Sequence, residues 1–168
     1  MKDINYFAYN GSLKGVTECI EKGGDVNALD AEGYTALHWN CFFGARGDFR
    51  LSIAESLIDS GADVNKLILE CELSPLLLAV QSGNGDLVLL LLRHGANPNQ
   101  KSDGSYPIVQ SAVIGDLKIA ELLIEYCADV FVKDCHGVDV FKMALEYEHE
   151  DIYQALKVRG SGLTFDTQ

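Results

Sequence analysis

The sequence predicts an all-α repeat solenoid, in which pairs of short helices follow one another along the chain. Three observations lead to this prediction. Glycines placed to end the first helix of each pair recur at nearly even spacing, at Gly11, Gly44, Gly83 and Gly115. Residues of the first helical turn recur at similar spacing, at Ala36, Pro75, Pro107 and Val140. A closing phrase also recurs, and its clearest copy is Gly61-Ala62-Asp63-Val64-Asn65.

The stretch from Asp30 to Asn65 carries the clearest version of the repeated unit. Its spacing and phrases resemble the ankyrin repeat, a unit of about 33 residues that combines a β-turn with two antiparallel helices and a Thr-Pro-Leu-His-x-Ala signature. Thr35-Ala36-Leu37-His38 lacks the proline of that signature, and Ser74-Pro75-Leu76-Leu77 lacks the histidine. The resemblance covers about residues 2 to 158 and implies helix-turn-helix pairs with β-turn or hairpin tips.

The repeat register divides the chain into a single domain at 1–158 and a C-terminal tail at 159–168. About five repeats are expected, at 1–29, 30–66, 67–100, 101–133 and 134–158. The first and the last are degenerate, as terminal caps need to be, because one of their faces has no neighbour. Thr35 and Ser74 stand where a side chain would cap a first helix. Three turn residues should pin the turns by hydrogen bonds: Asn27, Asn65 and Asn99.

Several positions depart from the repeat pattern. The second repeat has about five extra residues within Ala45 to Ser52, which predicts an enlarged loop before a helix that resumes at Ile53. This loop contains Arg46-Gly47-Asp48, a tripeptide of cell-adhesion ligands, but because the sequence carries no export signal we interpret the segment as an enlarged loop and not as an adhesion site. The entry to the third repeat, from Leu67 to Glu72, is one residue longer than the pattern, and Glu148 replaces the last helix-ending glycine.

Composition narrows the function classes. The formal net charge is -12, which disfavours nucleic acid and anionic membranes and favours a basic protein partner. The longest apolar run, Leu87 to Leu92, is too short to span a bilayer, and the N-terminus lacks a signal-peptide core. Five cysteines without a C-x-x-C pair indicate reduced thiols, and Cys135-His136 lacks further metal ligands. We therefore expect a cytoplasmic, monomeric protein without metal or cofactor.

Nothing in the sequence forms a convincing catalytic constellation. The segment from Glu146 to Asp151 is acidic and contains a histidine, but Tyr153 stands where a zinc-protease motif needs its second histidine. His38 and Cys41 share a helix face and could pair, yet they lack a third orienting group. The resemblance gives His38 a structural role, in which it links neighbouring turns by hydrogen bonds. The sequence therefore predicts that the protein is not an enzyme.

The candidate binding residues are those that helix packing does not require. The resemblance places the binding face on the concave side, formed by the turn tips and the first helices. Aromatic and aliphatic residues at such free positions are typical of a protein-binding surface. We expect it to centre on the second and third repeats and to include Tyr9, Leu29, Glu32, Tyr34, Phe42, Phe43, Leu67, Ile68, Glu70, Leu73, Gln81, Val113, Ile114, His136 and Tyr147. Alternatively, Phe42 and Phe43 fold against the enlarged loop.

Two classes of function remain open. The first is an adaptor that holds a protein partner for another activity. The second is a dedicated acidic inhibitor, such as an immunity-type protein that blocks a basic enzyme or toxin. A continuous acidic stripe on the concave face would favour the inhibitor, whereas carboxylates scattered over the outer helices would favour the adaptor.

Overall fold

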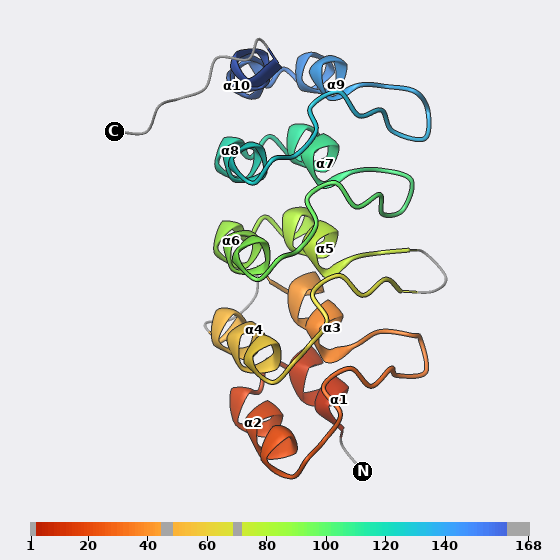
Figure 1. The fold of residues 1–168 in the computed structure, drawn as a ribbon, viewed down its shortest axis with the longest axis vertical. Coiled ribbons are helices and arrows are strands. Elements are labelled where there is room, and N and C mark those ends of the chain that lie inside the picture. Colours follow the sequence, from red (N-terminus) through yellow and green to blue (C-terminus); the bar gives the residue numbers. More distant parts are fainter. Residues whose placement is uncertain (1–2, 45–48, 69–71, 161–168) are drawn as a thin grey trace. The chain divides into compact units, whose positions relative to one another are not determined.

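The computed structural model describes residues 3–44, 49–68 and 72–160. Its contacts divide the chain into two compact units, Met1–Asn97 and Pro98–Gln168. The described residues form ten α-helices and no strands, with two isolated β-bridges at turns of the C-terminal unit (Figure 1). This all-helical architecture agrees with the predicted fold class.

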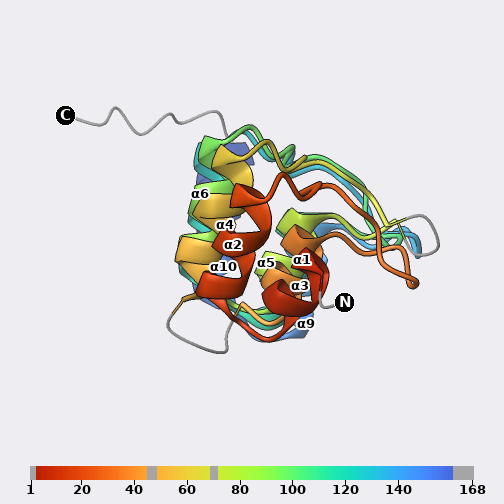
Figure 2. The ribbon, with the colours of Figure 1, turned by 90° about the horizontal axis from the view of Figure 1, so that it is seen from below.

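The N-terminal unit contains three helix pairs in two layers. Its helices are α1 (Ile4–Tyr9), α2 (Leu13–Glu21), α3 (Ala36–Phe42), α4 (Arg50–Asp59), α5 (Pro75–Gln81) and α6 (Gly85–Arg93). The first helices pack on one another, α1 on α3 and α3 on α5, and the second helices do the same, α2 on α4 and α4 on α6. Figure 2 shows these two layers from one end, with α2, α4 and α6 on one side and α1, α3 and α5 on the other.

The C-terminal unit repeats this arrangement with two pairs. Its helices are α7 (Pro107–Ile114), α8 (Leu117–Glu125), α9 (Val140–Glu146) and α10 (Glu150–Gly160). Again α7 packs on α9 and α8 packs on α10, while each first helix also packs on its own partner. The same pairing in both units follows from the same spacing of apolar residues, which gives each helix at least one face to bury.

The predicted caps begin the first helices. The Thr35 side chain accepts a hydrogen bond from the backbone of His38, and Ser74 does the same for Leu77 ahead of Pro75 at the first helical position. His38 completes a capping box, because its Nδ1 atom lies 3.2 Å from the Thr35 backbone nitrogen, which donates to it. Its Nε2 atom lies 3.0 Å from the carbonyl of Lys66. The predicted link between neighbouring turns is thereby confirmed.

The turn asparagines connect successive repeats, as expected. The Asn27 amide donates to the Gly61 carbonyl at 2.9 Å and accepts from the Asp63 backbone at 2.8 Å. Asn65 forms the same two bonds with the next turn, and Asn99 forms them within the C-terminal unit. Each asparagine thus satisfies one carbonyl and one amide of the neighbouring turn, which fixes the spacing of the repeats.

Gly44 does follow the first helix of its repeat, but its role differs from that of the other helix-ending glycines. Gly11, Gly83 and Gly115 have positive φ, whereas Gly44 does not. Gly44 is buried, and a Cβ atom there would lie 2.7 Å from Ser82 Oγ and 2.8 Å from Leu87 Cδ1. It is therefore required by the close approach of the next helix pair and not by its own backbone conformation.

The second and the last repeats differ from the regular pattern at the segment between their two helices. The second helix of the second repeat begins at Arg50, so the prediction that it resumes at Ile53 is wrong. Arg46-Gly47-Asp48 lies outside the described residues. At the last repeat Glu148 adopts φ 62°, so it takes the left-handed conformation that glycine has elsewhere.

Candidate functional site

A tight turn precedes α3 and is built around one carboxylate. Asp30 Oδ1 accepts hydrogen bonds from the backbone nitrogens of Glu32 at 3.0 Å and Tyr34 at 2.9 Å. Gly33 supplies the positive φ of 81° that the turn requires. The second oxygen, Asp30 Oδ2, accepts a hydrogen bond from the Trp39 indole Nε1. Asp30 therefore fixes both the turn and the orientation of the tryptophan on α3.

An aromatic cluster surrounds this tryptophan, and we define it as Tyr9, Tyr34, Trp39, Phe42 and Phe43. The Tyr34 and Trp39 rings are stacked, with centroids 4.5 Å apart. The Tyr9 ring meets Trp39 edge-on at 5.2 Å and Phe43 at 5.0 Å, and Phe42 meets Phe43 at 4.9 Å. These separations and angles are those that aromatic pairs favour, so the cluster is a packed unit that joins α1 to α3.

Arg50 anchors the end of the enlarged loop beneath this cluster. The residue is only 7% exposed. The guanidinium donates to the carbonyls of Ala8 and Tyr9 at the end of α1, and it lies 5.7 Å from the centre of the Phe43 ring. Carbonyls at a helix C-terminus carry partial negative charge, so a cation is favourable there. The start of α4 is in this way fastened to the end of α1.

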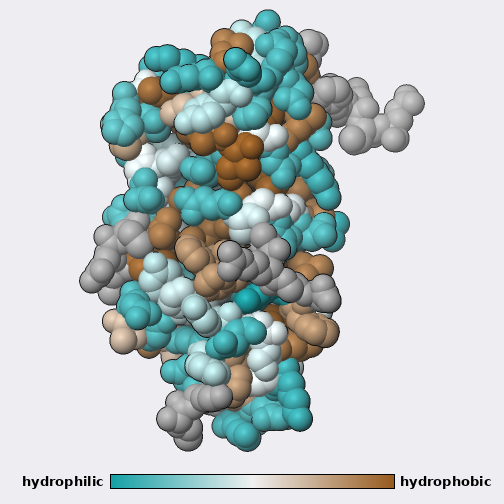
Figure 3. All heavy atoms as spheres, turned by 180° about the vertical axis from the view of Figure 1, so that it is seen from behind, coloured by the Kyte–Doolittle hydropathy of each residue, from teal (hydrophilic) through white to brown (hydrophobic). Residues whose placement is uncertain are grey.

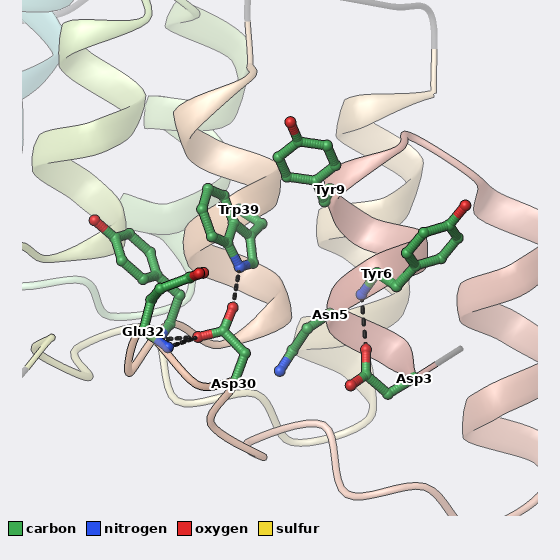
Figure 4. Close-up of a pocket in the computed structure, with 8 residues that line it drawn as sticks. Asp3, Asn5, Tyr6, Tyr9, Asp30, Glu32 and Trp39 are labelled. Atoms are coloured by element: carbon green, nitrogen blue, oxygen red, sulfur yellow. Dashed lines mark hydrogen bonds between the residues drawn. The ribbon is translucent and has the colours of Figure 1, made fainter. Parts of the chain in front are cut away.

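A pocket opens beside the cluster, between α1, the turn and α3. We call it the N-terminal pocket; its volume is about 510 Å³, and it is lined by Asp3, Asn5, Tyr6, Tyr9, Asp30, Glu32, Tyr34 and Trp39. Figure 4 shows three carboxylates and the aromatic rings around the same opening. Its volume falls within the range of roughly 300–1,000 Å³ that is usual for ligand pockets. An acidic and aromatic lining suits a cationic ligand.

Five of the predicted binding residues lie together in the structure, and the others lie apart from them. Tyr9, Glu32, Tyr34, Phe42 and Phe43 all belong to the aromatic cluster or the pocket. Tyr9 and Phe42 are 47% and 49% exposed. Other exposed candidates are Leu29, Gln81, Ile114, His136 and Tyr147, and half-buried ones are Leu67, Leu73 and Val113. The last four of the predicted set, from Val113 onward, lie in the C-terminal unit.

Among the predicted binding residues, the structure contradicts the prediction at Ile68. Ile68 is 1% exposed, so the expectation that it lies on the surface is wrong. Its backbone nitrogen bonds to the Leu73 carbonyl, as Asp30 bonds to Tyr34 in the second repeat, so Ile68 occupies the position of the turn aspartate and not a free position at the tip. Glu70 lies outside the described residues. The aromatic surface consequently rests on the first and second repeats, with less from the third than expected.

Sequence reasoning missed several pocket residues, namely Asp3, Asn5, Tyr6, Asp30 and Trp39. The repeat register held a signal for two of them. Tyr6 and Trp39 are separated by one repeat length, as are Tyr9 and Phe42, so each pair occupies one position on successive first helices. Equivalent positions on stacked helices lie side by side, so this spacing places aromatic residues next to one another.

The local chemistry does not support a nucleophile at Cys41. Burial raises the pKa of the Cys41 thiol to about 12, so the thiolate that would attack a substrate is absent at neutral pH. Both ring nitrogens of His38 already take part in hydrogen bonds to Thr35 and Lys66. Among the described residues no group of three or more His, Cys, Asp or Glu side chains could hold a metal ion. No described helix has the length and apolar character needed to cross a membrane.

The helix pairs, the capped turns and the asparagine links together define a repeat protein, and comparison with known families identifies which one. A profile of ankyrin repeats in three copies matches residues 76–164, and a second ankyrin profile matches residues 41–92. The chain belongs to the ankyrin repeat family. Ankyrin repeats generally mediate protein–protein interactions, and ankyrin repeat domains are typically non-catalytic.

Individual relatives share the repeats within larger proteins. A putative palmitoyltransferase ZDHHC13 of Danio rerio is 29% identical over 137 residues, which cover 81% of this chain and 20% of the relative. A B-cell lymphoma 3 protein homolog of Mus musculus is 34% identical over 114 residues, covering 67% of this chain and 24% of the relative. Alpha-latrocrustotoxin-Lt1a of Latrodectus tredecimguttatus is 30% identical over 116 residues, covering 67% of this chain and 8% of the relative. The chain thus spans less than a quarter of the length of these relatives.

Proposed function

We propose that this chain is a non-catalytic protein-interaction module that binds a protein partner on the turn tips and first helices of its N-terminal unit. The observation that carries the proposal is the aromatic cluster, in which Tyr9 and Phe42 remain about half exposed beside an open pocket. Aromatic residues that are fixed by packing and yet reach solvent are the residues that most often dominate binding energy at interfaces.

Exposed apolar atoms alone would not single out this surface. Figure 3 shows hydrophobic patches that alternate with hydrophilic ones on the face opposite to that of Figure 1, as on most protein surfaces. The N-terminal cluster is distinguished by its size, since five aromatic rings join α1, the turn and α3, whereas Phe131, Phe141 and Tyr153 form a three-ring cluster in the C-terminal unit. A contiguous and preorganised patch loses little side-chain entropy when a partner binds.

The placement of carboxylates favours the adaptor over the dedicated inhibitor. The first helices of the N-terminal unit, α1, α3 and α5, contain no Asp or Glu. Exposed carboxylates lie instead on the second helices, at Glu18, Glu21, Glu55, Asp59 and Asp86. Three further carboxylates, Asp3, Asp30 and Glu32, line the N-terminal pocket on the binding face, but they gather at one point and do not form a continuous stripe along the first helices. A partner is therefore attracted by the overall charge and meets clustered carboxylates at one place only.

The proposal can be tested by selecting ligands with a random-peptide library displayed on phage. Enriched peptides are synthesised and titrated against the parent chain and two variants. Phe42→Ala should weaken binding by about tenfold or more, because it removes an exposed aromatic anchor. Phe131→Ala is the matched control, since Phe131 is an exposed phenylalanine of the C-terminal unit, and it should bind as the parent does.

Two results would contradict the proposed function. Enriched peptides that bind Phe42→Ala as tightly as the parent would place the binding surface elsewhere, and a failure to enrich any peptide would argue against an interaction module. Phe42 is replaced and Phe43 is left in place, because Phe43 is half-buried and packs against Tyr9 and Arg50, so its removal would also lower stability. Thermal unfolding of each variant separates the two effects.

A further inference from the structure

We infer that the N-terminal pocket holds the guanidinium group of an arginine side chain in the partner segment. This inference rests on the proposed function and specifies the chemistry of the partner at one point. Four aromatic residues and three carboxylates converge on the pocket, and no lysine or arginine is among the described residues that line it. Such a lining attracts a cation both by charge and by the negative faces of aromatic rings.

The three carboxylates differ in how many of their oxygens remain available to accept a hydrogen bond from a ligand. Asp30 already accepts bonds from two backbone nitrogens and the Trp39 indole, so it mainly contributes charge. Asp3 uses one oxygen to cap α1, where Oδ1 accepts from the Tyr6 backbone at 2.8 Å. The Glu32 side chain is exposed, and its carboxylate has no hydrogen-bond or ion-pair partner among the described residues. Glu32 and the second oxygen of Asp3 are therefore the acceptors available to a ligand.

A buried amide provides a second and independent indication of a polar ligand. Asn5 lines the pocket and is only 4% exposed. Its Nδ2 atom donates to the Ala28 carbonyl at 3.1 Å, but its Oδ1 atom is buried and accepts no hydrogen bond from any described residue. Figure 4 shows Asn5 between Asp30 and Asp3. A buried acceptor without a donor is costly, and because Oδ1 is closed to solvent in the free protein, a ligand donor relieves that cost when a small rotation of the Asn5 side chain turns the atom toward the pocket.

Arginine fits this set of acceptors better than lysine does. A guanidinium presents five N–H donors in a plane, which can serve the carboxylates of Glu32 and Asp3 at once while the plane rests against an aromatic ring. An ammonium is compact and strongly hydrated, so it gives up more to leave water. The volume of about 510 Å³ leaves room for the long arginine side chain to enter together with adjoining backbone.

The single tryptophan of the chain provides a direct readout. Trp39 is the sole source of an indole N–H resonance, and that N–H points to Asp30 within the pocket. We would titrate ¹⁵N-labelled protein with N-acetyl-arginine N-methylamide and follow this resonance. The uncharged isostere N-acetyl-citrulline N-methylamide serves as the ligand control. We expect a saturable shift with the arginine probe and at least roughly fivefold weaker binding of the citrulline probe.

Variants test whether the pocket itself is responsible. Glu32→Gln keeps the shape of the side chain and the backbone bond to Asp30, and it should weaken the arginine probe several-fold. Glu121→Gln removes an exposed carboxylate of α8 and should leave the titration unchanged. Equal binding of arginine and citrulline probes, or equal effects of the two variants, would overturn the inference. Equal or stronger binding of the corresponding lysine or dimethyl-lysine probe would overturn the assignment to arginine.

The two proposals fail in different ways. If selected peptides depend on Phe42 but the arginine probe leaves the Trp39 resonance unmoved, the interaction surface stands and the arginine pocket is wrong. If the probe binds and responds to Glu32→Gln while no peptide can be enriched, the pocket stands and the protein-binding function is wrong.

Discussion

The turn before α3 and the turn before α9 have the same backbone hydrogen bonds but present different side chains. In the first, the Asp30 backbone nitrogen bonds to the Tyr34 carbonyl at 2.9 Å and Gly33 bonds to the Asp30 carbonyl at 3.1 Å. In the second, Asp134 bonds to Val138 at 2.9 Å and Gly137 bonds to Asp134 at 3.1 Å. Each aspartate side chain also accepts two further backbone N–H groups of its own turn.

The side chains that these two turns present are chemically unrelated. Where the second repeat has Glu32, Tyr34 and Trp39, the last repeat has His136, Val138 and Met143 at the same offsets from the turn aspartate. The third side-chain hydrogen bond, from Trp39 to Asp30, therefore occurs only in the first of the two turns. The comparison separates two roles of the repeat: hydrogen bonds among regularly spaced residues build the scaffold, and a few substituted positions build the site.

The position four residues after the turn should show the largest difference in stability. His38 is buried and bonded to Thr35 and Lys66, whereas its counterpart Lys142 is exposed. His38→Ala leaves buried donors and acceptors unpaired, and we expect the free energy of unfolding to fall by about 2–4 kcal/mol. Lys142→Ala should change it by no more than about 0.5 kcal/mol.

Urea denaturation followed by circular dichroism measures both effects, and Trp39 fluorescence reports the N-terminal unit separately. Equal losses in the two variants would mean that the histidine bonds between turns add nothing to the stability of the second repeat.

Acid should destabilise the N-terminal unit through the same histidine. Burial lowers the pKa of His38, and the hydrogen bond to the Lys66 carbonyl only partly opposes this effect. The unfolded chain therefore binds the proton more readily than the folded chain. The contribution of His38 is fully present above the pKa of the unfolded imidazole, roughly 6.5, and is lost as the pH falls from there toward the lower folded value.

We expect the urea midpoint of the parent chain to fall between pH 7.5 and pH 5.5, and the His38→Gln variant to show a flatter profile over that range. Parallel profiles for the two proteins would show that other groups cause the acid sensitivity.

The cysteines of the two units should differ in how fast they react with an alkylating reagent. Cys41 in α3 is fully buried with a pKa raised to about 12, whereas Cys127 and Cys135 in the C-terminal unit are exposed. Iodoacetamide at pH 8 should alkylate the two exposed cysteines at least about a hundredfold faster than Cys41, because only a deprotonated and accessible thiol reacts. Peptide mapping by mass spectrometry quantifies each site, and similar rates would show that α3 opens readily.

The scaffold could be predicted from the sequence because its determinants are local and periodic. Thr35 and Ser74 cap helices that begin one residue later, and Asn27, Asn65 and Asn99 bond to turns one repeat away. These bonds depend on spacing that can be counted along the chain. The glycine register also placed the ends of the first helices, although at Gly44 the reason proved to be packing against Ser82 and Leu87.

The candidate site could be predicted only in part. Tyr9, Tyr34, Phe42 and Phe43 were identifiable as residues that packing does not require. Ile68 looked equivalent and is buried, because it occupies the position that the turn aspartate has in other repeats, which the longer third turn hid in the sequence. Tyr6 and Trp39 could be predicted only as a pair, because they are separated by one repeat length. That spacing predicts neighbouring side chains only if the helices of successive repeats stack on one another.

By itself, the sequence determined the family, the helix pairs and the hydrogen bonds that space the repeats, since each depends on residues at fixed separations. Tertiary structure alone decided the pocket. The Trp39 indole had to reach Asp30, Asn5 had to keep an unpaired oxygen beside Asp3, and Arg50 had to bind the end of α1 from beyond the enlarged loop. The geometry of such contacts follows from how the turn and the helices pack and cannot be read from residue spacing alone.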